Sequence, residues 1–214
     1  MQHPDRALAE MFDAVPSNDL PEGENFNVCP TNQIAVVTSE GGSRRLRPMR
    51  WGLIPHWYKA PTDGPLLINA RADTIAEKPA FREAARQRRC LIPASGFYEW
   101  TVDGKDRLPW YIYRKDGAPI AFAGVWQMWD KGNTPQATCA IVTTEANLAM
   151  QQIHHRMPVI LERESWPLWL GEAGHGAAAL MQPSKDEVLE FYRVDSRVNS
   201  NRASGSDLIA PIEA

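Results

Sequence analysis

Residues 67–100 read LINARADTIAEKPAFREAARQRRCLIPASGFYEW, and this stretch decides most of what the sequence says about the fold. Its pattern predicts a strand over Leu66–Ala70 and a helix over Pro79–Arg89. Two further strands are predicted over Cys90–Pro93 and Gly96–Val102, separated by a short turn. One helix set among strands within so short a stretch indicates a mixed α+β chain.

Three polar residues, Asn69, Arg71 and Glu99, interrupt the apolar segments of this stretch. An amide that is buried without a partner costs about 2–7 kcal/mol. Polar residues in apolar surroundings are therefore expected either to satisfy one another or to have a chemical role. Mutual satisfaction is the explanation about as often as function is. We treat these three as candidate site residues and expect them to be enclosed by apolar neighbours.

The remaining sequence predicts short strands, tight turns and few helices. Helices are expected at Pro4–Phe12, Ala146–Ile153, Glu164–Leu170 and Lys185–Glu190. Strands are expected at Ile34–Thr38, Pro48–Leu53, Trp110–Arg114, Ile120–Trp129, Ala137–Thr143, Met157–Leu161 and Tyr192–Val194. The pairs Asp103-Gly104 and Asp116-Gly117 are typical of hairpin turns. No repeat or linker divides the chain, so we predict a single α+β domain, mostly antiparallel, with helices around it.

Composition favours a soluble globular protein, with 43% hydrophobic and 23% charged residues. No segment approaches the ~20 apolar residues of a membrane span, and Met1–Pro4 lacks the features of a signal peptide. A cytoplasmic location is therefore expected. The cysteines, Cys29, Cys90 and Cys139, are odd in number and scattered. This pattern argues against a disulfide framework or a structural zinc site, and we expect no metal and no cofactor.

The formal net charge is −3, so no overall field would attract a polyanion, and any nucleic acid must be bound by local patches. Two arginine clusters are present: Arg44, Arg45, Arg47 and Arg50, then Arg82, Arg86, Arg88 and Arg89. In the second cluster, three arginines spaced i, i+4, i+7 would share one helix face, for which solvation is the commoner explanation. Loop aromatics near the first cluster (Trp51, Trp57 and Tyr58) are typical of proteins that bind single-stranded DNA.

His154 lies between a predicted helix and the segment that leads into Pro158. A single histidine is commonly structural, but a histidine with a carboxylate partner is a frequent acid–base pair. Pairing of His154 with a cysteine would instead indicate a hydrolase. Cys29, in a loop beside Pro30, is the best of the three cysteines for that role, although free cysteines are often inert.

Five segments of the chain, taken in order, resemble one known family. They are Asn27-Val28-Cys29-Pro30-Thr31, Trp51-Gly52-Leu53-Ile54-Pro55, Ile68-Asn69-Ala70-Arg71-Ala72-Asp73-Thr74, Cys90-Leu91-Ile92-Pro93-Ala94-Ser95-Gly96-Phe97-Tyr98-Glu99-Trp100 and Ile153-His154-His155-Arg156-Met157-Pro158. They resemble the SRAP family of SOS response-associated peptidases, or abasic site processing proteins. Each motif is moderately specific, and the five together span nearly the whole chain.

The resemblance implies a single domain over residues 1–214 with a barrel-like, mostly antiparallel β core. It implies a DNA-damage function in which the protein binds single-stranded DNA at abasic sites or at junctions with duplex. It further implies no cofactor and no membrane, a monomer, and a cytoplasmic, nucleoid-associated location in a bacterium. In the family, the second encoded residue is a cysteine. Its α-amine and thiol together trap the sugar aldehyde as a thiazolidine crosslink.

The resemblance also implies roles for particular residues. Asn69 would position the cysteine or the opened sugar, Glu99 would transfer protons and assist removal of the initiator Met, and His154 would assist ring opening and crosslink reversal. These roles imply peptidase (self-processing) and lyase-like activity. The expected DNA-binding residues are Arg71 and Arg156, which would hold phosphates, the base-stacking residues Trp51, Trp57 and Pro30, and also Asn27 and Thr143.

The family begins Met-Cys-Gly-Arg, whereas this chain begins Met1-Gln2-His3-Pro4. We expect that the native start lies upstream and supplies the cysteine, because Asn69, Glu99 and His154 all remain. The alternative is a crosslink-incompetent protein that binds single-stranded DNA without a covalent bond. Cys29 is no substitute, because an internal cysteine has no free α-amine and cannot form a thiazolidine. A Cys29–His154 hydrolase remains a further hypothesis.

Overall fold

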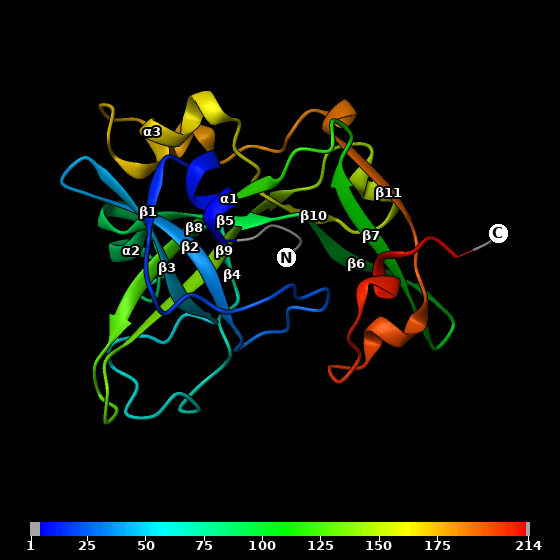
Figure 1. Ribbon diagram of the computed structural model, residues 1–214, viewed down its shortest axis with the longest axis horizontal. Coiled ribbons are helices and arrows are strands. Elements are labelled where there is room, and N and C mark those ends of the chain that lie inside the picture. Colours follow the sequence, from blue (N-terminus) through cyan, green and yellow to red (C-terminus); the bar gives the residue numbers. More distant parts are fainter. Residues whose placement is uncertain (1–4, 213–214) are drawn as a thin grey trace.

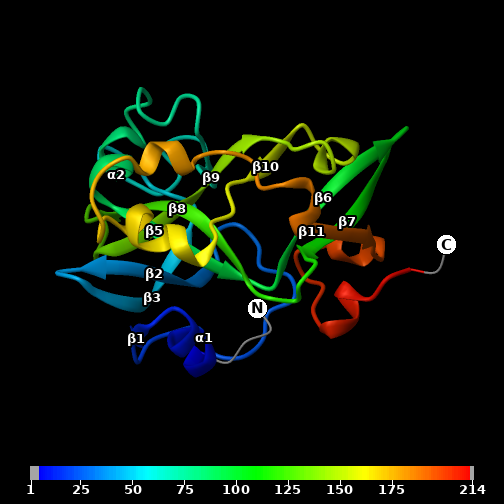
Figure 2. The same ribbon diagram turned by 90° about the horizontal axis from the view of Figure 1, so that it is seen from above.

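A computed structural model describes residues 5–212 and contains two β-sheets (Figure 1). The larger sheet has eight strands: β1 (Ala14–Pro16), β2 (Gln33–Glu40), β3 (Ser43–Trp51), β4 (Asn69–Arg71), β5 (Arg89–Ala94), β8 (Ile120–Trp129), β9 (Gln136–Glu145) and β10 (Arg156–Pro158). The smaller sheet has three: β6 (Gly96–Asp103), β7 (Asp106–Arg114) and β11 (Leu189–Arg193). The two sheets lie at opposite ends of the molecule in both ribbon views (Figure 2).

The larger sheet curls into a ring. Its order is β1-β3-β2-β5-β8-β9-β10, and an additional parallel pairing of β3 with β9 joins strands that are far apart in this order. Strands β3, β2, β5, β8 and β9 therefore close on themselves, while β4 adds to β9 in parallel. Most other pairs are antiparallel. The predicted α+β class and barrel-like core are confirmed, with a ring-like sheet rather than a formal barrel.

Alternate residues of the ring strands enter two separate apolar cores. In β2, Ala35 and Val37 join a core that also contains residues of the helices α1 (Asp5–Met11), α2 (Arg82–Gln87) and α3 (Trp166–Leu170). Ile34 and Val36 point the other way, into a core that includes Ile112 of β7 and Leu189 of β11. Successive side chains of a strand face opposite sides, so β2 contributes to both cores. The second core joins the ring to the smaller sheet.

Only one of the two predicted hairpins forms. Asp103-Gly104 connects β6 to β7, which pair along their length, and Gly104 has a φ of 60° as such turns require. Asp116-Gly117 also forms a turn, but β7 and β8 lie in different sheets. The second hairpin prediction is wrong because β11 occupies the free edge of β7, while β8 pairs with β5 and β9.

Three helix predictions need correction. The helix expected at Ala146–Ile153 is only a 3-10 turn at Met150–Gln152, because the Asn147 side chain accepts a hydrogen bond from the Met150 amide and donates one to the Ser184 carbonyl. The helix expected at Lys185–Glu190 is a 3-10 turn at Asp186–Val188 that leads directly into β11. The helix expected at Pro79–Arg89 is confirmed only over the six residues of α2.

The strands of the central core lie where the sequence predicts them, with boundaries that differ by a few residues. Strand β3 begins earlier than expected, at Ser43, and β4 covers Asn69–Arg71 instead of Leu66–Ala70. The predicted strand Met157–Leu161 is β10, Arg156–Pro158. The predicted helix Pro4–Phe12 corresponds to α1, and its Pro4 lies outside the described residues. Between residues 5 and 212, no helix has the length and apolar character needed to span a membrane.

Candidate functional site

The second half of β9 brings four of the predicted site residues onto one face of the sheet. Strand β4 pairs with one edge of β9 and β10 with the other. The register matches Asn69 to Ile141, Arg71 to Thr143, and Arg156 to Glu145. Paired residues share a face, so Asn69, Arg71, Thr143 and Arg156 project from the same side of the sheet.

Arg71 and Arg156 are linked through one carboxylate, Asp73. Arg71 donates to both Asp73 oxygens, at 3.1 and 2.7 Å, and these hydrogen bonds lower the pKa of the Asp73 carboxyl. Nη2 of Arg156 lies 3.6 Å from Asp73 and donates to the Thr143 carbonyl oxygen at 2.7 Å. Arg156 is 13% exposed and Arg71 is 59% exposed. One cation is therefore fixed against the sheet while the other extends into solvent.

The expectation that Asn69 and Arg71 are enclosed is wrong, because both side chains are exposed. Strand β4 has three residues, and only Ala70, the central one, enters the core. Since side chains alternate across a strand, a buried Ala70 forces its two neighbours outward. Their polarity is thus compatible with solvent and leaves both side chains available to a ligand.

Asn69 and Arg71 line a hollow of about 340 Å³. Trp57 and Lys78 also contribute to its wall, and Trp57 is 46% exposed, a large fraction for an indole. The Trp57 ring packs edge-on against its neighbours His56 and Tyr58. The hollow therefore presents an amide, two cations and an aromatic ring to solvent. This combination suits an anionic ligand with planar groups.

His154 is half-buried directly before β10, and its ring nitrogen contacts the backbone of Arg156. Nδ1 lies 2.9 Å from the Arg156 carbonyl oxygen and 3.1 Å from the Arg156 amide nitrogen. The His154 amide donates to the Met150 carbonyl at 2.9 Å, which fixes the loop that carries the ring. The His155 ring lies against it, with ring centres 4.4 Å apart. These contacts orient the imidazole beside the arginine cluster.

Glu99 is half-buried in the middle of β6, opposite Trp110 of β7. Burial raises the pKa of the Glu99 carboxyl, and the charge of His154, the Trp100 amide and the charge of Arg107 partly oppose this increase. Glu99 and His154 therefore interact electrostatically across the junction of the two sheets. A carboxyl whose pKa is raised holds its proton closer to neutral pH, as a general acid must.

The loop that precedes β2 holds the other predicted residues near the end of β3. Thr31 donates its amide to the Trp51 carbonyl at 2.7 Å, which keeps Pro30 beside this strand end. Trp51 donates its indole N–H to the Ile68 carbonyl at 3.1 Å, next to Asn69. Nδ2 of Asn27 donates to the carbonyls of Ser200 and Ala203. The Asn27 amide thus holds the C-terminal loop in place.

The cysteines have none of the features of an activated nucleophile. Burial raises the pKa of the Cys29 thiol, whose hydrogen-bond acceptors are oxygens of Asn27. Within residues 5–212, no hydrogen bond links Cys29 to His154. Cys90 and Cys139 are fully buried, and burial raises the pKa of both thiols. An activated thiol needs a cationic neighbour that lowers its pKa.

Both arginine clusters differ in part from what the sequence suggested. Arg44 pairs with Glu172, Arg47 pairs with Glu40, and Arg50 donates to the Gly52 carbonyl, so most of the first cluster is neutralised or engaged. In the second, Arg89 leaves the helix and its guanidinium donates to carbonyls at the end of α2. The expected shared face of three arginines therefore does not form.

Sequence reasoning missed Asp73 and Lys78. Asp73 lies two residues after Arg71, and this spacing in a strand would have indicated that the two side chains share a face. Lys78 follows the turns after β4 and lines the hollow together with Trp57, which is distant from it in the sequence. Across the described part of the chain, no three His, Cys, Asp or Glu side chains converge as metal ligands would.

Comparisons with known sequences point to one family, and a solved structure shares the fold. Residues 1–201 match the sequence model of the family described as SOS response associated peptidase (SRAP). The abasic site processing protein YoqW of Bacillus subtilis is 42% identical over 199 residues, which cover 89% of this chain and 88% of YoqW. The abasic site processing protein YedK of Escherichia coli is 29% identical over 205 residues, covering 92% and 89%. A crystal structure of a protein from Bacteroides thetaiotaomicron superposes with a TM-score of 0.85 at 28% identity, covering 100% and 98%.

Proposed function

The chain belongs to the SOS response associated peptidase (SRAP) family, and from this premise we propose that it processes abasic sites in DNA during the response to DNA damage. Its relatives carry that function in their names, and the chain covers most of the length of YoqW and YedK. DNA is the partner, and single-stranded DNA or a junction with duplex is the proposed form. We further propose that the protein acts as a monomer on the bacterial nucleoid.

The observation that carries the proposal is a line of contacts that runs from Arg71 through Asp73 and Arg156 to the His154 ring. Arg71 lines the hollow, and the Asp73 carboxylate links Arg71 to Arg156. The backbone of Arg156 contacts the His154 ring, and the charge of His154 opposes the increase that burial causes in the pKa of Glu99. A DNA strand whose phosphates bind the two arginines would therefore bring a sugar within reach of proton donors. The proposed binding and the proposed chemistry would then share one surface.

The roles proposed for DNA contacts follow from exposure and charge. Arg71 and Arg156 would bind phosphates on either side of the damaged nucleotide, since guanidinium groups form paired hydrogen bonds with phosphate. Trp57, with its exposed indole, would stack on a base. Trp51, Pro30 and Thr143 border this surface, and Asn27 would act through the loop that it anchors.

The proposed chemistry begins with the ring-opened sugar, which presents an aldehyde. An α-amine adds to the aldehyde carbon, and loss of water gives an imine. A thiol on the same residue then adds to the imine carbon while the nitrogen takes a proton, which closes the thiazolidine. Glu99 and His154 would move these protons, and Asn69 would hold the sugar. Glu99 would also assist hydrolysis of the initiator Met.

This covalent step requires an α-amine and a thiol on one residue, and residues 1–4 lie outside the described part of the chain. Cys29, Cys90 and Cys139 are internal, so none of them meets the requirement. We propose crosslinking for a chain that carries Cys directly after its initiator Met, and non-covalent binding for a chain that lacks this Cys. The second candidate function is therefore binding of single-stranded DNA without a covalent bond, supported by the arginines and Trp57. The raised pKa of Cys29 counts against the Cys29–His154 hydrolase.

Two forms of the protein test the proposal. The protein without the extension should bind single-stranded DNA that contains a stable abasic analogue, with an affinity that falls steeply as the salt concentration rises. A form extended to begin Met-Cys-Gly-Arg should give a heat-stable, slower-migrating band with DNA that contains a true abasic aldehyde. The same extension with Ser in place of Cys is the control. Binding without a covalent band in the extended form would leave only the non-covalent function, and no binding by either form would overturn both.

A further inference from the structure

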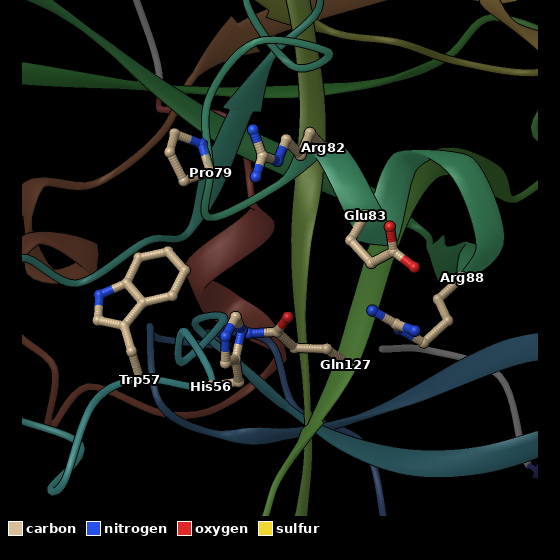
Figure 3. Close-up of a pocket in the computed structure, with 7 residues that line it drawn as sticks. All are labelled: His56, Trp57, Pro79, Arg82, Glu83, Arg88 and Gln127. Atoms are coloured by element: carbon tan, nitrogen blue, oxygen red, sulfur yellow. The ribbon is translucent and has the colours of Figure 1, made fainter.

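Beside the hollow of Asn69 and Arg71 lies a second, larger one of about 430 Å³. Trp57 and Pro79 belong to both, so they form the wall between the two hollows. Figure 3 shows the far side of the second hollow, where Arg82, Glu83 and Arg88 project from the start and end of α2. A strand of DNA in the first hollow would therefore meet the second as soon as it passes Trp57.

The charge of the two hollows is opposite to that of the chain. The net charge of the protein is −3, yet Arg71, Lys78, Arg82 and Arg88 line the hollows, with Glu83 as the carboxylate among their lining residues. A concave surface of one sign attracts ligands of the other sign and concentrates them locally. An anion is thus the ligand that these two hollows favour together.

The two arginines of the second hollow are also unpaired. Within residues 5–212, neither the Arg82 nor the Arg88 guanidinium forms a hydrogen bond or an ion pair, and Nε of Arg88 is buried without a partner. In Figure 3 the Arg82 side chain points toward Pro79, and the Arg88 and Glu83 side chains point toward each other. Buried polar groups in folded proteins normally have a partner, so an unpartnered Nε beside a hollow indicates a ligand.

Several other arginines of this protein are paired with carboxylates. Arg44 and Arg114 each contact a carboxylate at 2.7 Å, and Arg47 does so at 2.9 Å. Arg86, on the same short helix as Arg82, is exposed and does not line either hollow. The Arg86 guanidinium also forms no hydrogen bond or ion pair within residues 5–212, so what distinguishes Arg82 and Arg88 is that they line the hollow and that Nε of Arg88 is buried without a partner. Their position next to an exposed indole matches the arrangement by which proteins hold single strands.

We propose that the second hollow is a binding subsite for the nucleotide adjacent to the one held by Asn69 and Arg71. Arg82 and Arg88 bind the phosphodiester of that nucleotide, and its base lies against Trp57. This inference rests on the proposed function, because it extends the path of the same DNA strand. It adds a second phosphate site, formed by α2, that lies beyond the residues expected from the family motifs.

The test compares Arg82→Gln with the matched control Arg86→Gln, two exposed arginines of one helix. Binding to an unmodified single strand of about 12 nucleotides is followed by fluorescence anisotropy over a range of salt concentrations. Loss of one phosphate contact should lower the slope of log K against log salt by about 0.7. We expect this decrease and a severalfold weaker affinity for Arg82→Gln, a wild-type slope for Arg82→Lys, and no change for Arg86→Gln.

A second measurement locates the contact. Single neutral methylphosphonate linkages are placed in turn along a strand that contains a stable abasic analogue. In the wild type, the linkage next to the analogue on one side should weaken binding, and in Arg82→Gln the same linkage should cause no further loss. Arg88→Gln should give the same result as Arg82→Gln, provided that thermal melting shows that the Arg88 variant folds. If the Arg88 variant does not fold, the result for Arg82→Gln alone decides whether the subsite exists.

Arg71→Gln separates failure of the subsite from failure of the proposed function. If Arg71→Gln weakens binding while Arg82→Gln behaves like Arg86→Gln, the second subsite is wrong and the proposed function stands. If neither Arg71→Gln nor Arg82→Gln weakens binding, the proposed function fails as well. A methylphosphonate effect that persists unchanged in Arg82→Gln would also overturn the subsite.

Discussion

Nδ1 of His154 lies within hydrogen-bond distance of both backbone polar groups of Arg156, at 2.9 Å from the carbonyl oxygen and 3.1 Å from the amide nitrogen. When Nδ1 is unprotonated it can accept from the amide, and when it carries a proton it can donate to the carbonyl. The ring thus keeps a backbone partner in either charge state. Arg156 in turn donates to the Thr143 carbonyl from its guanidinium. A single residue therefore connects the proposed proton-transfer group to the proposed phosphate site.

His154→Gln should slow the reaction without weakening DNA binding. In the form extended to begin Met-Cys-Gly-Arg, we expect the rate of crosslinking, or of its reversal, to fall about 10²–10⁴-fold, the usual contribution of general acid–base catalysis. His155→Gln is the control, because His155 is exposed and contacts His154 only through its ring. Gel kinetics with abasic DNA give the rates and anisotropy gives the affinities. Equal rates for the two variants would remove His154 from the chemistry.

Glu99→Gln should stabilise the fold at neutral pH. Burial raises the pKa of Glu99 above its ordinary value of 4.5, so the folded state binds the proton more tightly than the unfolded state does. The free energy of unfolding therefore decreases as pH rises from the pKa of Glu99 in the unfolded state through its pKa in the folded state. Above both pKa values, the ionised Glu99 destabilises the fold by its full amount. Gln carries no such penalty.

We expect the variant to have a higher Tm than wild type near pH 7, by about 2–4 °C for each kcal/mol removed, with the difference shrinking toward about pH 4. Calorimetry across this pH range measures it, and crosslinking by the extended form should be slower at the same time. A Tm difference that grows as pH falls would contradict the raised pKa.

Asp73→Asn should tighten binding of undamaged single-stranded DNA. Asp73 contacts both Arg71 and Arg156, so its charge competes with phosphate for the two cations. Removing this charge should raise the affinity and steepen its salt dependence. The exposed ion pair contributes little to the fold, so the Tm should change only slightly.

The chain supplies a matched control for this variant in Asp116→Asn. Arg114 donates to Asp116 at 3.0 and 2.7 Å, with the same two-residue spacing as Arg71 and Asp73. That pair lies at the end of β7 in the smaller sheet, so DNA affinity should not change there. Weaker binding in Asp73→Asn would mean that the carboxylate positions the arginines instead of competing for them.

Gly124→Ala should destabilise the ring of strands. A Cβ at position 124 would lie 2.8 Å from Sγ of Cys90 and 2.9 Å from Cδ1 of Ile92, closer than packed atoms approach. Overpacking of this kind costs about 1–3 kcal/mol. Denaturant unfolding measures the loss, and Cys90→Ala provides the test of cause. In the double variant the added methyl group gains space, so the two losses should be less than additive; strict additivity would mean that the strain lies elsewhere.

Local pattern was sufficient for the elements that depend on local chemistry. Short runs of strand-favouring residues located β2, β5, β8 and β9, and the pair Asp103-Gly104 identified the hairpin of β6 and β7. Local pattern failed at Asp116-Gly117. An Asp-Gly turn can reverse the chain whether the next strand pairs with the preceding one or enters another sheet, so the turn alone does not predict a hairpin. Local pattern also failed at Lys185–Glu190, where helix-favouring residues form a 3-10 turn and a strand because β7 offers a free edge.

The sequence by itself determined the family, the mixed α+β class and the candidate residues Asn69, Arg71, Glu99, His154 and Arg156. Only the tertiary structure decided which of these are exposed, which share a carboxylate and which arginines are unpaired. Burial and ion pairing depend on contacts between segments that are far apart in the chain. Side chains alternate along β4 and β9, but which of them face solvent is known only when the partner strand and its register are known. The sequence identified Asn69 and Arg71 as candidates, but the parallel pairing of β4 with β9 in the closed ring is what places them on one surface.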